Sequence, residues 1–138
     1  MLPEWVLLRK KIEESKPNLQ GADLGNAKLM GIDLAAADLN GADLSMAYLV
    51  RANLRGANLT DADLKDAVIS EADLREADLN GADLEDAYLH GADLTGVSNL
   101  TCDQIELAHF DKSTRFPDYI QITWTSEKNC TCSEKTGD

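Results

Sequence analysis

The sequence predicts an all-β solenoid of square cross-section, with about four coils and a short helical cap at each end. Three observations lead to this fold class. An aliphatic residue returns at every fifth position from Leu19 to Leu94, an alanine stands two residues before nearly all of them, and the pattern fills about 80 of the 138 residues. A strict short repeat indicates one small structural unit that is copied and stacked.

A period of five residues excludes the regular elements that the composition alone would suggest. Five residues turn an α-helix by about 500°, so successive leucines would scatter around its circumference. A strand would place the leucines of an odd repeat on alternate faces. The repeat instead fits a chain that turns a corner after each pentapeptide. Glycine, asparagine and aspartate are frequent at the expected corners, where they tolerate a positive φ.

The residue before each central leucine predicts the number of pentapeptides in one coil. This residue is Asp or Asn in 12 of the 16 repeats. The four exceptions are spaced by twenty and are Lys28, Tyr48, Val68 and Tyr88. We therefore expect four pentapeptides per coil, with residues twenty apart stacked at about 4.8 Å. The residues expected in the core are Leu24, Leu39, Leu44, Leu59, Leu64, Ile69, Leu79 and Leu84.

Segments outside the repeat are expected to cover the open ends of the stack. In the first segment Trp5, Leu8 and Ile12 have helical spacing and are expected to face the first coil. After the repeat, Thr101 and Gln104 resemble a capping box that begins a short helix. The chain is thus divided into an N-terminal capping helix (1–17), the β-helix (18–98), a C-terminal cap (99–126) and a flexible tail (127–138).

Charge and cysteine content bound the environment of the protein. The net charge of −12 opposes direct binding to nucleic acid or to an anionic membrane. No apolar run approaches the about 20 residues that a membrane-spanning helix needs, and the first residues do not resemble a secretory signal. An odd number of cysteines without such a signal predicts reduced thiols at Cys102, Cys130 and Cys132 and a cytoplasmic location.

The negative charge is concentrated in residues 18–98, which carry a net charge of −10. One predicted face holds an acidic column formed by Asp23, Asp43, Asp63, Asp66, Asp83, Glu85 and Asp86. Two interpretations stay open. The column imitates the phosphates of duplex DNA, or its carboxylates bond neighbouring backbone amides and keep the protein soluble. Stacked carboxylates repel one another by only about 1 kcal/mol in water, so the column requires no metal ion.

The neighbouring face is the least acidic and most apolar part of the predicted surface. This candidate interaction face consists of Lys28, Met30, Tyr48, Val50, Val68, Tyr88 and His90. Aromatic residues and methionine are enriched at the centres of protein interfaces, so the face is expected to dock a protein partner or a second copy of the chain. The alternative is that tyrosine and valine ladders only stabilise neighbouring strands.

No set of residues predicts catalysis or cofactor binding. The three cysteines with His90 and His109 do not have the spacing of a standard structural zinc site. Flat faces offer no concave pocket, and no nucleophile, base and acid come together in the pattern. We therefore expect no catalytic residue, no metal and no cofactor.

The motif Ala-Asp/Asn-Leu-x-x, as at residues 22–26 and 57–61, closely resembles the pentapeptide repeat family. The resemblance implies a right-handed quadrilateral β-helix. Two roles are expected for the chain; the first follows from the candidate interaction face, and the second from the acidic charge together with the resemblance. The first is a non-enzymatic scaffold that presents flat faces to a still unidentified protein partner. The alternative is a mimic of duplex DNA that inhibits or protects DNA gyrase or another DNA-binding enzyme, as a subset of the family does.

Overall fold

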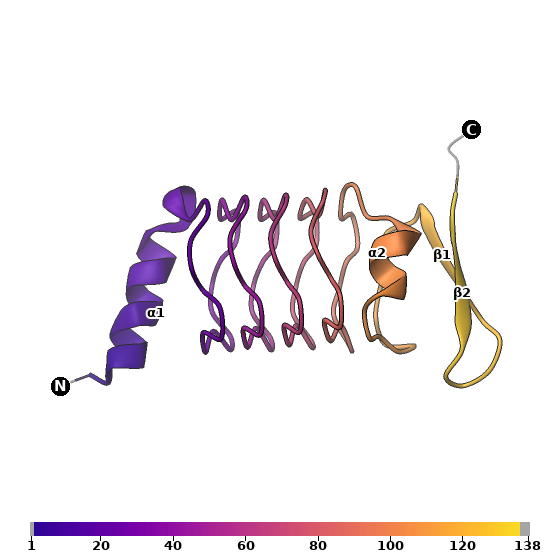
Figure 1. Cartoon of the computed structure of the whole chain (residues 1–138), viewed down its shortest axis with the longest axis horizontal. Coiled ribbons are helices and arrows are strands. Elements are labelled where there is room, and N and C mark those ends of the chain that lie inside the picture. The colour runs from indigo at the N-terminus through magenta and orange to yellow at the C-terminus, as the bar shows by residue number, and fades with distance from the viewer. Residues whose placement is uncertain (1, 136–138) are drawn as a thin grey trace.

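A computed structural model describes residues 2–135 of the chain. Figure 1 shows helix α1 at one end, a stack of coils in the middle, and α2 with a hairpin at the other end. The elements are α1 (Glu4–Glu14), the 3-10 helix η1 (Lys16–Asn18), α2 (Cys102–Glu106), β1 (Ile120–Trp124) and β2 (Cys130–Glu134). Within the described residues, no helix has the length and apolar character needed to cross a membrane.

The coils are held together by parallel β-bridges between residues twenty positions apart. Asp23 is bridged to Asp43, which is bridged in turn to Asp63, and the same spacing recurs on three further faces. Backbone hydrogen bonds connect adjacent coils in both directions. The Leu44 N–H donates to Asp63 O at 2.8 Å, and the Asp63 N–H donates to Ala42 O at 2.9 Å. One turn of the chain around the axis therefore contains four pentapeptides.

Each corner contains a residue in the left-handed region, which turns the chain without a long loop. Seven glycines and ten other residues adopt φ values from 56° to 74°. Ala36, Met46 and Arg51 do so without the freedom of glycine, at a cost of about 1 kcal/mol each. Hydrogen bonds close the corners, as where the Ala27 N–H donates to Leu24 O at 3.1 Å.

The core is a set of aliphatic columns inside the coils, with alanine filling the narrower space beside them. All eight residues expected in the core are buried. Leu24, in the first coil, is 7% exposed, and the other seven are at most 1% exposed. A square coil of copied pentapeptides thus leaves almost no accessible apolar surface in its interior.

Helix α1 touches the first coil along only part of its length. The expectation that Trp5 and Leu8 cover this coil is wrong, because their side chains are 55% and 51% exposed. Ile12 is buried, and the Glu13 carboxylate accepts a hydrogen bond from the Asp33 N–H at 3.2 Å. These contacts lie near the C-terminal end of α1, and Figure 1 shows its N-terminal end leaning away from the coils.

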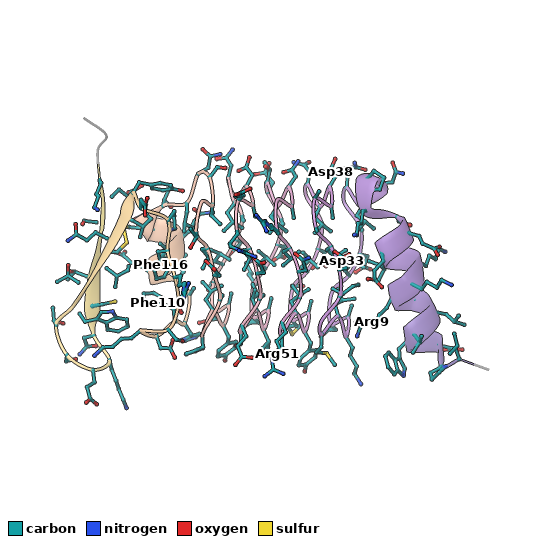
Figure 2. All side chains as sticks on the ribbon, turned by 180° about the vertical axis from the view of Figure 1, so that it is seen from behind. Arg9, Asp33, Asp38, Arg51, Phe110 and Phe116 are labelled. Atoms are coloured by element: carbon teal, nitrogen blue, oxygen red, sulfur yellow. A yellow bond between two sulfur atoms is a disulfide. The ribbon has the colours of Figure 1, made fainter. Side chains whose placement is uncertain are left out.

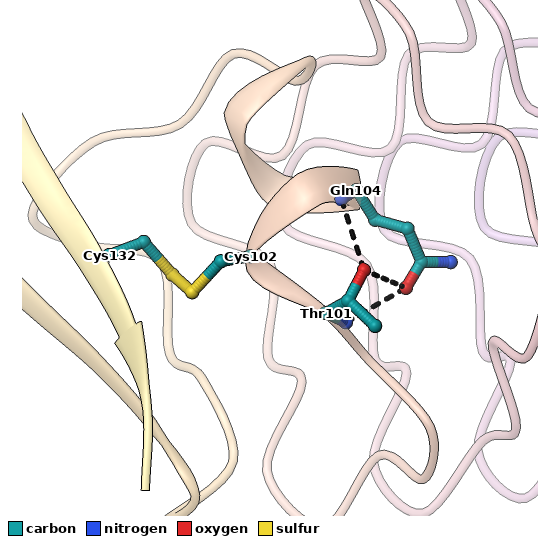
Figure 3. Close-up of a disulfide and its surroundings, with 4 residues drawn as sticks. All are labelled: Thr101, Cys102, Gln104 and Cys132. Atoms are coloured by element: carbon teal, nitrogen blue, oxygen red, sulfur yellow. Dashed lines mark hydrogen bonds between the residues drawn. A yellow bond between two sulfur atoms is a disulfide. The ribbon is translucent and has the colours of Figure 1, made fainter.

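The C-terminal end is covered more completely. Thr101 and Gln104 form the expected capping box at the start of α2 (Figure 3). The expectation of a flexible tail at 127–138 is wrong for its described part, because β2 pairs antiparallel with β1, with Ile122 opposite Cys132. Ordinary strand pairing orders this polar segment, which lacks an apolar run of its own. Residues 136–138 of the expected tail lie outside the described residues.

The expectation of three reduced thiols is wrong for two of the cysteines. Cys102 at the start of α2 and Cys132 in β2 form a disulfide, with their Cα atoms 5.7 Å apart (Figure 3). They are 30 residues apart in sequence, and only folding brings them together. Cys130 is a half-buried free thiol. Burial, together with the nearby Glu106 carboxylate, raises the pKa of the Cys130 thiol.

Candidate functional site

The Asp and Asn residues before the central leucines shape the corners of the coil. In eleven repeats the side-chain oxygen of this residue accepts a hydrogen bond from the backbone N–H two residues later, at 2.9 to 3.4 Å. Such local bonds satisfy amides at turns that the sheet ladder leaves unpaired. Most of the negative charge of the repeat block therefore has a structural role at the corners.

The acidic column follows this rule. Its four stacked members, Asp23, Asp43, Asp63 and Asp83, are joined by parallel bridges. Each of them accepts a bond from the amide two residues later. The Ser45 side-chain hydroxyl, which donates to Asp43 at 2.6 Å, and the Ser45 N–H lower the pKa of the Asp43 carboxyl.

A cation interrupts the acidic column. Lys65 Nζ lies 3.5 Å from an Asp83 carboxylate oxygen. Asp83, with smaller contributions from Asp63 and Glu85, raises the pKa of the Lys65 amine. At the adjacent corner Asp66 is exposed, and Asp86 lies 3.2 Å from His109 Nε2. The structure thus brings the predicted acidic residues together, but with Lys65 and His109 beside them.

The candidate interaction face lies on the next side of the coil. Parallel bridges join Lys28 to Tyr48, Tyr48 to Val68 and Val68 to Tyr88. Tyr48 and Tyr88 are 46% and 42% exposed. The bridge pattern continues from Tyr88 to His109 in the C-terminal cap. The four residues that break the Asp/Asn rule therefore form one continuous stack along the molecule.

This stack lacks the corner bond found on the other faces. Lys28, Tyr48, Val68 and Tyr88 offer no side-chain acceptor to the amide two residues later. Among the described residues, nothing accepts a hydrogen bond from these four amides, which belong to Met30, Val50, Ser70 and His90. Four corner bonds, each with a net contribution of about 0.5–1.5 kcal/mol, are absent from this face.

Exposed apolar side chains gather on the same side of the coil. The large hydrophobic residues of the repeat block that are most exposed are Met30 at 44%, Met46 at 48%, and the two tyrosines. Met46 stands at the corner two residues before Tyr48, with φ of 57°. Sequence reasoning missed Met46, although an apolar residue at a corner that favours glycine, asparagine or aspartate was a usable signal.

The face ends at a cleft of about 350 Å³ between the last coil and the hairpin. The His109 ring stacks on the Tyr88 ring with centroids 5.0 Å apart. The ring of His90, two residues after Tyr88, has its centroid 6.3 Å from that of Tyr88. Phe110 and Trp124 line the cleft, and Phe110 packs edge-on against Phe116 (Figure 2). His109, Phe110, Phe116 and Trp124 follow the break in the repeat register, so their position could not be read from the period.

A further face carries charged pairs. Arg75 binds the Asp73 carboxylate through two nitrogens at 2.7 and 2.9 Å. This hydrogen bonding lowers the pKa of the Asp73 carboxyl and raises that of Arg75. On another corner Arg51 Nε lies 2.6 Å from Glu71 one coil away. Exposed pairs of this kind contribute little to stability, about 0–1 kcal/mol each.

Among residues 2–135, no three His, Cys, Asp or Glu side chains are arranged to hold a metal ion. His90, His109, Cys130 and Cys132 all line the cleft. Cys132 is not available as a thiolate ligand, because it is bonded to Cys102. The cysteine and histidine residues considered as a zinc set are thus largely brought together, but with one disulfide and one free thiol.

The repeats match a known protein family. The model of pentapeptide repeats (8 copies) matches residues 18–56 and 57–96. No curated protein matches this chain.

Among the solved structures that are similar to it are the following three. HetL, a pentapeptide repeat protein involved in heterocyst differentiation regulation from the cyanobacterium Nostoc sp. strain PCC 7120, is 34% identical with a TM-score of 0.36. That match covers 56% of this chain and only 46% of HetL. A pentapeptide repeat protein from the Arabidopsis thaliana thylakoid lumen is 29% identical, with a TM-score of 0.43, over 78% of this chain and 69% of its own.

The third is QnrB1, a plasmid-mediated fluoroquinolone resistance protein. It is 22% identical with a TM-score of 0.40, and the match covers 73% of this chain and 58% of QnrB1. The matched repeats, at residues 18–56 and 57–96, make up more than half of the sequence. The chain therefore belongs to the pentapeptide repeat family.

Proposed function

We propose that the protein is a right-handed, four-coil quadrilateral β-helix with a cap at each end, and that it acts as a non-enzymatic scaffold. Its candidate interaction face, extended by Met46 and by the cleft beside Tyr88, docks a protein partner. The single observation that carries this proposal is the loss, in all four coils, of the Asp or Asn that closes the corner. On this face alone the turn-forming Asp or Asn is replaced in every coil, by Lys28, Tyr48, Val68 and Tyr88.

The energetic balance supports a binding role. A coil that needed only stability would keep the corner bond of about 0.5–1.5 kcal/mol in each repeat. Cross-strand contacts between tyrosine and valine return a comparable 0.2–1 kcal/mol or so per pair. These contacts give no reason for an apolar side chain at Met30 and Met46, which are 44% and 48% exposed. Methionine and aromatic residues grouped on a surface with few charges are typical of an interface.

The test replaces Tyr48 and Tyr88 by Asp in one variant. The matched control adds the same two negative charges on another face, at the exposed residues Asn40 and Asn80 (Asn40→Asp and Asn80→Asp). Each protein is used to capture partners from its native extract, and hydrogen exchange of the complex maps the protected residues. We expect the tyrosine variant to lose the partner by at least about tenfold, corresponding to about 1.4 kcal/mol, while the control keeps it. Equal capture by both variants, with equal thermal stability, would remove this face from consideration.

A second candidate function rests on the net charge of −10 in the repeat block. In this alternative the acidic column imitates duplex DNA and acts on DNA gyrase or another DNA-binding enzyme. The structural use of each column aspartate, and Lys65 beside Asp83, favour the scaffold. A supercoiling assay tests the gyrase case: absence of inhibition at tens of micromolar protein and low salt, where screening is weakest, rejects mimicry directed at DNA gyrase.

A further inference from the structure

Helix α1 has two sides that differ in burial. The side that faces the first coil contains Val6, Arg9, Ile12 and Glu13, of which Ile12 is buried and the others are half-buried. Figure 2 shows Arg9 on this side. Residues three, four and seven apart share one face of a helix, so these four belong to one stripe. The coil thus accounts for one side of α1.

A second stripe of α1 adjoins the first where Leu8 lies one turn before Ile12, and it faces solvent. It consists of Glu4, Leu7, Leu8 and Lys11, all exposed, and both leucines are 51% exposed. Trp5 has the spacing of the coil-facing stripe, four residues before Arg9, yet is 55% exposed because it lies near the end of α1 that leans away from the coils. The second stripe places two leucines in the centre, an acid at one end and a base at the other. We call Glu4, Leu7, Leu8 and Lys11 the outer stripe.

We propose that the outer stripe is a self-association surface, which pairs with the outer stripe of a second copy across a two-fold axis. In an antiparallel pair whose facing residue numbers add up to 15, Leu7 lies opposite Leu8 of the other copy and Glu4 lies opposite Lys11. The two-fold axis repeats each contact, as an isologous interface requires. At each end of the paired stripes an acidic side chain then faces a basic one, and the leucines in the centre are removed from water.

The charge distribution selects this end of the molecule for self-association. Residues 1–17 carry a net charge of +1, whereas residues 18–98 carry −10. Two copies repel one another wherever their repeat blocks approach. Because α1 covers one end of the coil axis, pairing through its outer side keeps the two acidic blocks at opposite ends of a longer rod (Figure 1). A purely basic partner would pair with Glu4 but not with Lys11, and a purely acidic partner would pair with Lys11 but not with Glu4.

The test is a charge exchange, read by sedimentation equilibrium of the full chain. The wild-type protein is expected to form a dimer of twice 15.0 kDa. Glu4→Lys and Lys11→Glu each turn two attractive contacts into repulsive ones, so each is expected to weaken dimerisation at least about tenfold. The double variant Glu4→Lys/Lys11→Glu recreates opposite charges across the axis and is expected to restore the dimer. Glu127→Lys, the same change in the hairpin at the other end, is the matched control and is expected to leave the dimer unchanged.

Two outcomes overturn the proposal. One is a wild-type chain that stays monomeric over the whole concentration range, including a chain that instead binds lipid vesicles through α1. The other is a dimer that the charge exchange does not restore, with the helix content of all variants equal by circular dichroism. Leu7→Asp removes the apolar centre and is expected to abolish the dimer. The Tyr48→Asp/Tyr88→Asp variant is expected to keep it, so failure of the proposed function is distinguishable from failure of this interface.

Discussion

The two ends of the β-helix are closed in different ways. At the C-terminal end, cap side chains donate to carbonyls of the last coil. Gln104 Nε2 donates to Leu79 O at 2.8 Å, and the Tyr119 hydroxyl donates to Val97 O at 2.6 Å. A disulfide joins α2 to the hairpin above it. At the N-terminal end, α1 buries one residue, Ile12.

The backbone of the first coil reflects this difference. The Asp33 and Asp38 amides donate to Glu13 and Lys16, respectively, so two of the four faces are covered. In the described part of the chain, no acceptor is found for the corresponding amides of Asp23 and Lys28. On these two faces the inner residues Ala22 and Ala27 are only half-buried.

A repeat stack must cover its terminal edges, because unpaired strands invite association with other chains. The C-terminal edge is finished within the chain itself. The N-terminal edge is finished on two faces only, and the exposed stripe of α1 stands beside it. The two caps of one solenoid can therefore differ in how completely they cover its terminal coils. One closes the edge of the coil, and the other leaves two of its faces and one stripe of α1 exposed.

The largest effect on stability is expected in the core, where two leucines of one column lie at opposite ends of the stack. Leu84 lies beneath the C-terminal cap and is 1% exposed, whereas Leu24 lies in the first coil and is 7% exposed. Leu84→Ala is expected to lower the free energy of unfolding by about 2–5 kcal/mol, because the closed end cannot collapse around the cavity. Leu24→Ala is expected to cost less, about 1–3 kcal/mol, because the open end loses less burial. Urea denaturation of both variants measures the two losses, and equal losses would contradict the difference between the ends.

The disulfide gives the next largest effect. It closes a segment of 30 residues, from Cys102 to Cys132. Its loss in Cys102→Ser/Cys132→Ser is expected to lower the free energy of unfolding by about 2–4 kcal/mol through the entropy of the unfolded chain. Reductant should reproduce this loss in the wild type, and Cys130→Ser serves as the matched control that leaves stability unchanged. If reductant changes neither the stability nor the hydrogen exchange of the hairpin, the disulfide does not fasten the C-terminal cap.

The disulfide also bears on location. Disulfides persist in oxidising compartments and are rare in a reducing cytoplasm. The cytoplasmic location expected from the sequence stays a prediction, and its cysteine argument no longer supports it, because Cys102 and Cys132 are paired. Fractionation of cells, combined with thiol labelling of the isolated protein, tests the location and the redox state together.

The repeat could be predicted from the sequence because its information is redundant. Five-residue spacing fixes which side chains face inward, and the Asp/Asn rule with its four exceptions gives the twenty-residue coil. The same exceptions predicted the stack from Lys28 to Tyr88, which the bridges show as vertical neighbours. Each prediction here rests on many copies of one unit, so errors at single positions matter little.

The ends could not be predicted in the same way, because each of their contacts occurs once. The alternation of Ile120, Ile122 and Trp124 was a usable signal for β1, but β2 has no apolar run to mark it, and its link to α2 through Cys132 depends on contacts distant in sequence. Helical spacing placed Trp5, Leu8 and Ile12 on one side of α1, but the angle between α1 and the coil decides which of them is buried. His109 continues the predicted face only because the chain returns after the register break.

The smallest expected effect concerns acid and salt at the two ends. The N–H of Ala35, followed by the Lys16 ammonium, lowers the pKa of the Asp33 carboxyl at the N-terminal cap. The Ser113 hydroxyl is the main cause of a lowered pKa at Asp111, in the C-terminal cap. A carboxyl with a depressed pKa in the folded state stabilises the fold above its ordinary pKa of about 4, and this contribution is lost as the pH falls through the folded-state value.

Asp33→Asn and Asp111→Asn are therefore each expected to reduce the drop in melting temperature between pH 5 and pH 2. Salt should then separate the two ends. Lys16 lies 3.1 Å from Asp33 on the exposed surface, so added salt screens part of its effect. At Asp111 the donor is the neutral Ser113 hydroxyl rather than a charged group, so salt screens this bond less. In melting curves, the difference in melting temperature between wild type and Asp33→Asn is expected to be smaller at high salt than at low salt. The difference for Asp111→Asn is expected to stay nearly constant. The reverse order would mean that local hydrogen bonds, rather than the Lys16 ion pair, set the pKa of Asp33, and that charged neighbours rather than Ser113 set that of Asp111.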